Sequence, residues 1–192
     1  MSVEPAHPLS AVHSGNPCFR YAVVADVNAI VALVNSAYRG ESSRAGWTTE
    51  ADLLGGQRTD AEEISRLVGT EGSMILLCLS GDEIIGSVHL EQADAATAYL
   101  GMLVIKPVLQ GRGLGSRLLA AAETLARTKW GAARMQMQVI MPRLELIAFY
   151  QRRGYLGTGE FRPFPAADPR FGVPRVAGLR FEVLEKSLMP AS

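Results

Sequence analysis

The sequence predicts a mixed α/β fold in which helices pack on a mostly antiparallel sheet. Three observations predict it. The 192 residues are 48% hydrophobic and 20% charged, which is an ordinary globular composition and a suitable length for one domain. Short runs rich in β-branched residues alternate with segments whose apolar residues recur at helical spacing. Three of the strand-like runs follow one another through short turns, which is typical of an antiparallel meander.

The strands are predicted from apolar or alternating runs bounded by turn residues. They are expected at 19–24, 73–79, 83–91, 97–105, 135–140 and 179–186. The second, third and fourth of these runs form the meander. Ser80-Gly81-Asp82 and the segment 93–96 are its two turns.

Four helices are predicted from amphipathic spacing and end signals. They are expected at 26–39, from 59 or 60 to 68, at 116–129 and at 143–153. Asp26 is a good N-cap for the first, Thr59 or Asp60 for the second, and Gly154 is a left-handed cap for the last. The Gly-, Ser- and Thr-rich segment 41–57 is expected to be a loop, and the Pro-rich stretch 162–174 to be irregular.

The composition limits the cellular compartments in which the protein is expected. The segment 1–17 has no apolar block, so we expect a mobile extension rather than a signal peptide, followed by a single domain over 18–192. Cys18 and Cys78 are too few for a disulfide framework, so a reducing cytoplasm is expected, and Cys78 is expected to be a buried structural thiol. No apolar run is long enough to cross a membrane.

The distribution of charge along the sequence limits the kinds of ligand that the protein is expected to bind. The net charge is zero, which argues against a dedicated nucleic-acid binder. Residues 1–100 carry a balance of −8 and residues 101–192 a balance of +8. The acid-rich half mildly favours a cationic ligand, unless the two halves interleave in space and the asymmetry averages away. No His, Cys or carboxylate spacing indicates a metal.

The run Gln110-Gly111-Arg112-Gly113-Leu114-Gly115 lies between a predicted strand and a strongly helical segment. Where a strand leads into a helix, the first-turn N–H groups lack intrahelical partners and carry the positive end of the helix dipole. Glycines there let the backbone approach a bulky anion. The sequence therefore predicts a phosphate-binding loop.

The order of elements, together with Gln110, Gly113 and Gly115, resembles the GCN5-related N-acetyltransferase (GNAT) superfamily, without assigning a subgroup. The strand ending in Lys106-Pro107, and Phe149-Tyr150 followed by Gly154-Tyr155, fit the same pattern. The resemblance spans residues 19–188. It implies a GNAT-like fold with about seven strands flanked by about four helices.

The resemblance implies that the chain binds acetyl-CoA as its acyl donor. The pyrophosphate would lie on the amides of residues 111–116, and the pantetheine arm would pair with a splayed central strand, whose unpaired backbone groups need partners. The implied cofactor-binding residues are Leu103, Val104, Ile105, Gln110, Gly111, Arg112, Gly113, Leu114, Gly115, Ser116 and Arg143. Lys106, Arg112 or Arg117 would face the remaining phosphate. Arg143 and Leu146 stand where many relatives carry Asn and Ala, so contacts there can differ.

Acetyl transfer to an amine needs a neutral amine, a stabilised oxyanion and a proton for the leaving thiolate. A lysine-like amine is only about one part in a thousand neutral at pH 7. The resemblance assigns Tyr150 as the acid for the thiolate, and a backbone N–H near Leu103 as an oxyanion donor. The alternative for Tyr150 is packing of the last helix together with Phe149.

The general base is not fixed by the sequence. Tyr99 and Gln138 occupy the positions where the histone-acetylating and the ribosomal-protein branches of the family carry a glutamate. Glu91 is the best remaining carboxylate, working through ordered water, and its alternative is an exposed charge at a strand end. His89 alternates within a strand and is expected to be structural.

The resemblance places Tyr38, Arg44, Trp47 and Tyr99 beside the acceptor. Arg44 would suit an acceptor carboxylate, and the segment 162–175 could fold over the opening as a lid. The acceptor is expected to be a primary amine of unidentified structure, and a homodimer through the last strands is plausible.

The motifs bear on three candidate functions. An N-acetyltransferase acting by direct attack within a ternary complex fits the whole set of motifs. A non-catalytic acyl-CoA sensor is the alternative, because the usual carboxylate positions are vacant. A dinucleotide oxidoreductase fits poorly, since Ser116 fills the third glycine position and the preceding strand belongs to a meander.

Overall fold

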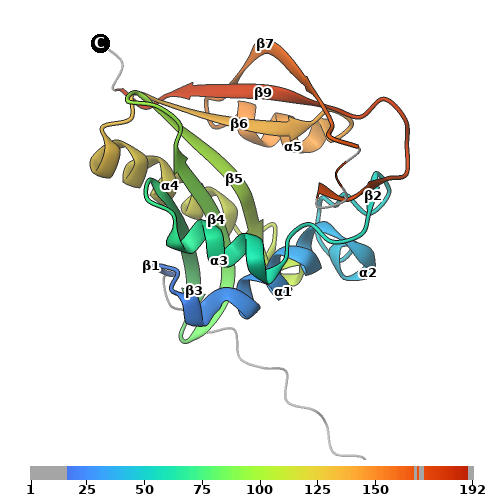
Figure 1. The fold of residues 1–192 in the computed structure, drawn as a ribbon, viewed down its shortest axis with the longest axis horizontal. Helices are drawn as coiled ribbons and strands as arrows, with labels where there is room; N and C mark the ends of the chain where they lie inside the picture. The colour runs from blue at the N-terminus through green and yellow to red at the C-terminus, as the bar shows by residue number, and fades with distance from the viewer. Residues whose placement is uncertain (1–16, 167, 169–170, 190–192) are drawn as a thin grey trace, which may run out of the picture.

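The computed structural model describes residues 17–166, 168 and 171–189. Apart from Pro17, the predicted N-terminal extension lies outside the described residues. The main sheet has the strand order β1-β3-β4-β5-β6-β9-β7 (Figure 1). Its strands are β1 (Cys18–Tyr21), β3 (Ser73–Ser80), β4 (Glu83–Gln92), β5 (Thr97–Ile105), β6 (Arg134–Ile140), β7 (Leu156–Pro163) and β9 (Arg180–Ser187). All neighbours are antiparallel except β5 and β6, which confirms the predicted mixed fold.

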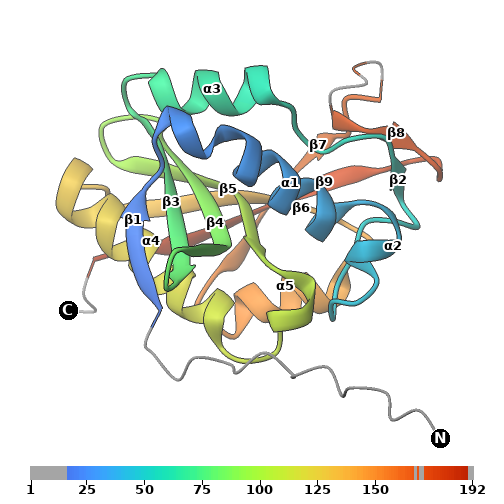
Figure 2. The ribbon, with the colours of Figure 1, turned by 90° about the horizontal axis from the view of Figure 1, so that it is seen from below.

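The helices of the described chain cover both faces of this sheet. They are α1 (Val27–Tyr38), α2 (Gly40–Ser43), α3 (Ala61–Gly69), α4 (Leu114–Trp130) and α5 (Leu144–Gln151), with short 3₁₀ turns at Val24–Asp26 and Pro107–Leu109. Figure 2 shows α1 and α3 on one face, with α4 and α5 on the other. Within the described residues, no helix combines the length and apolar character needed to cross a bilayer.

Strand β3 shows how the sequence builds two cores. Met74, Leu76 and Cys78 point to the α4 side, where they pack in a cluster with side chains of α4 and α5. The residues between them, Ile75 and Leu77, pack in a second cluster with α1 and α3. Because side chains alternate along a strand, a strand covered on both faces reads as a continuous apolar run. Cys78 is fully buried, as predicted for a structural thiol.

The sheet splits between its two central strands. β5 and β6 pair in parallel only at Thr97–Leu100 with Arg134–Met137, although both strands continue beyond that stretch (Figure 1). The ladder between β4 and β5 is interrupted in the same region, and Met102 has a φ of 48°, the sole positive φ of a non-glycine residue among the described residues. A bulge of this kind bends the strand and leaves backbone groups without ladder partners. The splay implied by the family resemblance is therefore present.

The first strand and its helix differ in detail from the prediction. The strand ends at Tyr21, and a 3₁₀ turn precedes α1. The Asp26 carboxylate accepts from the Val23 N–H at 2.9 Å and pairs with Arg20, so it caps the turn rather than α1. Asp60, in contrast, caps α3 as predicted, because its Oδ1 accepts from the Glu63 N–H at 2.8 Å.

Two predicted loops contain regular structure. The segment 41–57 overlaps α2 and includes β2 (Leu54–Gly55), which pairs with β8 (Val173–Pro174) from the segment predicted to be irregular. β2 and β8 are two residues each and are formed by pairing distant parts of the chain, which no local periodicity encodes. Strand β7 is exposed along its whole length, so it lacks the alternation that marks a half-buried strand.

Candidate functional site

Two cavities meet on the α5 side of the splayed strands. The larger, here called the loop cavity, has a volume of about 400 Å³ and lies against the glycine loop. The smaller, called the inner cavity, has a volume of about 130 Å³ and lies between β5, β6 and the segment after β7. Both are lined by Tyr38, Leu103, Arg143, Leu146 and Tyr150. A ligand in either cavity therefore reaches the same wall.

Most of the predicted cofactor residues lie together on the loop cavity. Its lining includes Leu103, Val104, Ile105, Gln110, Gly111, Gly113, Gly115, Ser116 and Arg143. Two others do not line it: Arg112 is exposed, and Leu114 packs its side chain against the core. The main-chain amide of Leu114 still belongs to the first turn of α4.

The glycine loop has the backbone shape expected of an anion site. Gly111 and Gly113 have φ values of 77° and 79°, a region that residues with a Cβ rarely adopt. The helical hydrogen bonds of α4 begin with the amide of Arg117, which donates to the Gly113 carbonyl at 3.1 Å. The amides of residues 114–116 precede it and have no carbonyl one turn back. Open space beyond both glycines leaves room for a bulky group.

Gln110 holds the loop in place. Its Nε2 donates to the Ile105 carbonyl at 3.0 Å, and its Oε1 accepts from the Trp47 N–H at 3.1 Å. The backbone at Gly46 approaches so closely that a Cβ there would lie 2.4 Å from the Gln110 Oε1. Gln110 therefore ties the loop to the end of β5 and to the segment after α2, and its role in the described chain is positioning.

Arg153 is a site residue that the sequence reasoning missed. Its guanidinium bonds the Ser116 hydroxyl, donates to the Phe149 carbonyl at 2.7 Å and lies 3.6 Å from the centre of the Phe149 ring. Partial burial lowers the pKa of Arg153 from its ordinary high value. These contacts fix a cation beside the first turn of α4, where phosphate oxygens would lie. The sequence feature that could have indicated Arg153 is its position just before the predicted cap Gly154.

Tyr150 lies on the wall shared by the two cavities. Its side chain is 5% exposed and its ring packs edge-on against Phe149 and Tyr155, at centroid distances of 5.2 and 5.8 Å. Within the described chain, no group hydrogen-bonds its hydroxyl. Burial raises the pKa of Tyr150 well above its ordinary value of about 10, so the hydroxyl keeps its proton at neutral pH. The ring packs with its aromatic neighbours, as the packing alternative for Tyr150 expected. The hydroxyl can still form a hydrogen bond with a ligand.

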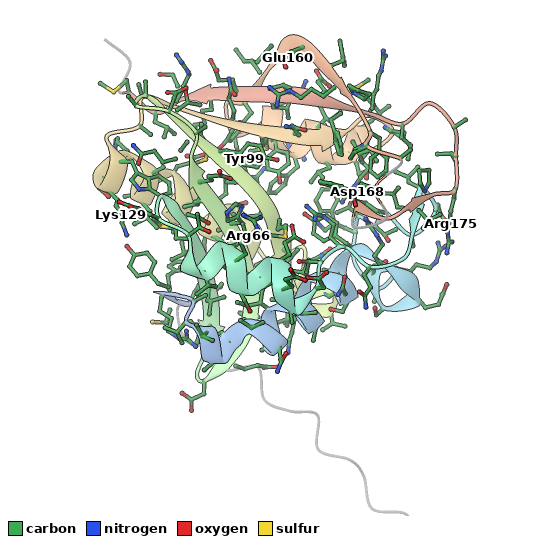
Figure 3. All side chains as sticks on the ribbon, viewed as in Figure 1. Arg66, Tyr99, Lys129, Glu160, Asp168 and Arg175 are labelled. Atoms are coloured by element: carbon green, nitrogen blue, oxygen red, sulfur yellow. The ribbon has the colours of Figure 1, made fainter. Side chains whose placement is uncertain are left out.

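The structure separates the predicted acceptor residues. Tyr38 lines both cavities, and Tyr99 lines the inner one, at the level where β5 and β6 diverge in Figure 3. Trp47 lines only the loop cavity, where its ring lies 5.7 Å from that of Phe149. Arg44 lines neither cavity, because it is exposed and bonded to Asp52 at 2.6 Å and to Glu41. Burial raises the pKa values of both Tyr38 and Tyr99.

A buried ion cluster forms one side of the inner cavity. Glu50 accepts from Arg143 at 2.8 Å and pairs with Arg39, and all three side chains are less than a tenth exposed. Arg143 also donates to the Thr48 hydroxyl at 2.9 Å. Arg143 lines the loop cavity, but its guanidinium is bound within the protein, so its predicted contact with the cofactor stays a prediction. Arg39 and Glu50 belong to no motif in the sequence. They meet Arg143 only because the fold brings three separate segments together.

The candidate bases lie in different places. Glu91 is directly opposite Tyr99 in the β4–β5 ladder, but it is exposed and lines neither cavity. Gln138 lines the inner cavity. His89 is buried and bonded to the Ser73 hydroxyl at 3.0 Å, and burial lowers the pKa of His89 to about 4. The structural role predicted for His89 is consistent with these contacts.

The described part of the chain offers little for metal or thiol chemistry. It contains no cluster of three His, Cys, Asp or Glu side chains that could hold a metal ion. Burial raises the pKa of the Cys78 thiol to about 11, which leaves it protonated and a poor nucleophile at neutral pH.

Described residues of the segment after β7 line the inner cavity, whereas the lid suggested for 162–175 stays a prediction. Phe164 and Phe171 line the cavity, and the Phe171 carbonyl accepts from Arg39 at 3.2 Å. Arg175, labelled in Figure 3, donates through its backbone N–H to the Leu53 carbonyl and through its side chain to the Ala51 carbonyl, both at 2.9 Å. Residues 167, 169 and 170 of this segment lie outside the described residues.

Comparison with known families agrees with this geometry. Residues 27–155 match the acetyltransferase (GNAT) family. The chain belongs to the GNAT acetyltransferase family. It is 36% identical over 96 residues to a mycothiol acetyltransferase of Thermobispora bispora, a match that covers 50% of this chain and 28% of that relative. The chain thus spans little more than a quarter of that longer protein.

Solved structures share the fold at low sequence identity. An N-acetyltransferase from Staphylococcus aureus Mu50 superposes with a TM-score of 0.68 at 12% identity, over 92% of this chain and 100% of that one. A GNAT family acetyltransferase from Elizabethkingia anophelis, solved with acetyl-CoA bound, gives a TM-score of 0.53 at 16% identity, over 66% and 82% of the two chains.

Proposed function

We propose that the protein transfers an acetyl group from acetyl-CoA to a primary amine by direct attack within a ternary complex. The observation that carries this proposal is the meeting of the loop cavity and the inner cavity at Tyr150. A donor in one cavity and an acceptor in the other would place the thioester and the amine beside one partner-free hydroxyl. Family membership supports acyl transfer from acetyl-CoA.

The donor is assigned to the loop cavity. The diphosphate would accept from the amides of residues 111–116 at the start of α4, with Arg153 supplying a positive charge. The pantetheine amides would pair with backbone groups of Leu103 and Ile105, which β6 does not pair where it diverges, although the Ile105 carbonyl also accepts from the Gln110 Nε2. This arrangement directs the thioester toward Tyr150.

In the reaction a carbon–nitrogen bond forms, a carbon–sulfur bond breaks and two protons are transferred. The neutral amine nitrogen attacks the thioester carbon, and the amide of the Leu103 region is assigned to stabilise the oxyanion. When the tetrahedral intermediate collapses, the carbon–sulfur bond breaks and its electron pair goes to sulfur. Tyr150 gives its proton to that sulfur and recovers one from the nitrogen through solvent. The products are the N-acetylated amine and CoA.

The amine is proposed to lose its proton without a carboxylate in contact with it. Glu50, the single acid among the described residues that line the inner cavity, is engaged by Arg39 and Arg143. Arginines around the cavity favour the neutral form of a bound amine because a second positive charge is repelled there. Glu91, across the ladder from Tyr99, is proposed as the proton acceptor at the rim, through water. A Glu91→Gln variant should lower kcat if this relay operates.

The test is release of free CoA thiol from acetyl-CoA in the presence of an amine panel, with the acetylated product identified by mass spectrometry. The proposal expects amine-dependent thiol release and a product carrying one acetyl group. Tight binding of acetyl-CoA with no amine-dependent release across the panel would instead favour a non-catalytic acyl-CoA sensor. A homodimer, a cytoplasmic location and the absence of nucleic-acid binding stay predictions.

A further inference from the structure

We infer that the acceptor is a small amine that also carries an anionic group, such as a free amino acid, and that Arg58 binds this group. This inference rests on the proposed function and narrows its substrate class. It comes from the charge balance of the inner cavity, which is the opposite of what the first half of the sequence suggested.

Among the described residues, the charged side chains that line the inner cavity are Arg39, Arg58, Arg143 and Glu50. Three cations thus face one anion. Among the acidic residues of the described part of 1–100, Glu50 alone reaches this cavity. The excess acid of that half lies elsewhere, so its sequence-level preference for a cationic ligand does not apply to the site. A diamine would bring two ammonium groups into a region that is already positive.

Arg58 is the cation available to a ligand. Arg39 and Arg143 both bond Glu50, which accounts for one anion and leaves both guanidinium groups held in place. The Arg58 guanidinium lies 5.5 Å from the centre of the Tyr38 ring, and no side-chain acid of the described chain pairs with it. Its backbone N–H donates to the Asn35 Oδ1 at 2.7 Å, which fixes the start of the side chain. A planar guanidinium held on an aromatic face is suited to bidentate binding of a carboxylate.

The cavity also limits the size of the acceptor. Its volume of about 130 Å³ is much smaller than the about 400 Å³ of the loop cavity, so the acceptor is expected to be the smaller of the two ligands. Phe164, Phe171 and Phe181 contribute apolar walls. A short amine with a carboxylate or similar anion and a modest apolar side chain matches this charge, size and polarity. Arg44, the residue from which the sequence suggested carboxylate binding, is paired on the surface instead.

The experiment uses the full chain with acetyl-CoA and three matched pairs of acceptors: L-leucine and L-leucinamide, L-phenylalanine and its amide, and β-alanine and its amide. Each pair keeps the amine and removes the negative charge. Rates are compared at equal concentrations of neutral amine, and 1,4-diaminobutane serves as the cationic probe. At least one acid should exceed its amide by about 10- to 100-fold in kcat/KM, as expected for a charge-assisted hydrogen bond.

Variants assign the effect to Arg58. Arg58→Gln should lower kcat/KM for the preferred acid by a similar factor, mainly through KM, and leave its amide unchanged. Arg58→Lys should restore part of the loss, because a point charge replaces the bidentate group. Arg66→Gln is the matched control, since Arg66 is an exposed arginine on α3 that lines neither cavity (Figure 3). Arg66→Gln should change kcat/KM for neither the acid nor its amide.

Equal acetylation of acids and amides, or preferred acetylation of the diamine, would overturn the inference and leave the proposed function standing. Acetylation of none of the probes, with acetyl-CoA still bound, would count against the proposed function itself and so remove the basis of the inference. An equal loss in the Arg58→Gln and Arg66→Gln variants would show that general charge, rather than the cavity, is responsible.

Discussion

Replacing Tyr150 by phenylalanine removes one hydroxyl from the point where the two cavities meet. In the described chain this hydroxyl has no hydrogen-bond partner, so its loss leaves no buried group unsatisfied, and the free energy of unfolding should change by less than about 0.5 kcal/mol. A proton donor contributes roughly 10²- to 10⁴-fold to the rate of such a step. The barrier should therefore rise by about 3–5 kcal/mol, with little change in acetyl-CoA affinity.

The assay is steady-state thiol release together with calorimetric binding of acetyl-CoA. Tyr155→Phe is the matched control: its hydroxyl donates to the Met135 sulfur at 3.2 Å, and the side chain is fully buried. That variant should lose stability and keep its kcat. Because burial raises the pKa of Tyr150, the wild-type rate should also show no loss from tyrosine ionisation below about pH 10. An unchanged kcat in Tyr150→Phe would refute the assignment of the leaving-group acid.

Three further predictions concern the loop, the ion cluster and pH. Gly113→Glu should weaken CoA binding at least 10-fold, as measured by calorimetry. Gly131→Glu is the control, because Gly131 has a similar positive φ at the other end of α4, and this variant should not weaken binding. An equal loss of CoA affinity in both variants would show that backbone strain alone is responsible. Glu50→Gln should lower the free energy of unfolding by about 3–5 kcal/mol in urea titrations, because two buried arginines lose their anion; a loss below about 1 kcal/mol would contradict this. Since the pKa of His89 is about 4 in the fold and about 6.5 unfolded, the unfolded state binds the extra proton, so stability present above pH 6.5 should fall by up to about 3 kcal/mol between pH 6.5 and 4. His89→Gln should flatten that pH dependence, and an unaltered slope would contradict the assignment.

The sequence predicted those parts of the fold that local patterns encode. The apolar run of β3, the turn at Ser80-Gly81-Asp82 and the cap at Asp60 all lie where expected. Strand β7 was not located from its own residues, because it is exposed along its length and shows no alternation. The β2–β8 pair likewise depends on contacts between segments more than a hundred residues apart.

The site divides in the same way. The glycine loop and Tyr150 carry a motif with fixed spacing, so the sequence located them. The inner cavity does not: Arg39, Glu50 and Arg143 come from three segments, and only folding brings their charges together. Arg44 was selected because the family resemblance places its segment beside the acceptor, yet Asp52 and Glu41 hold it at the surface. The charges of the inner cavity therefore required the structure, whereas the position of the glycine loop could be predicted from its motif.

Calorimetric titration of the full chain with CoA and with acetyl-CoA addresses the central claim most directly, namely that main-chain amides at the start of α4 bind the diphosphate of an acyl carrier. The account predicts saturable binding of both compounds with one site per chain, and weaker binding when the Arg153 guanidinium is removed by Arg153→Ala. Absence of binding heat at several temperatures, with properly folded protein, would contradict it.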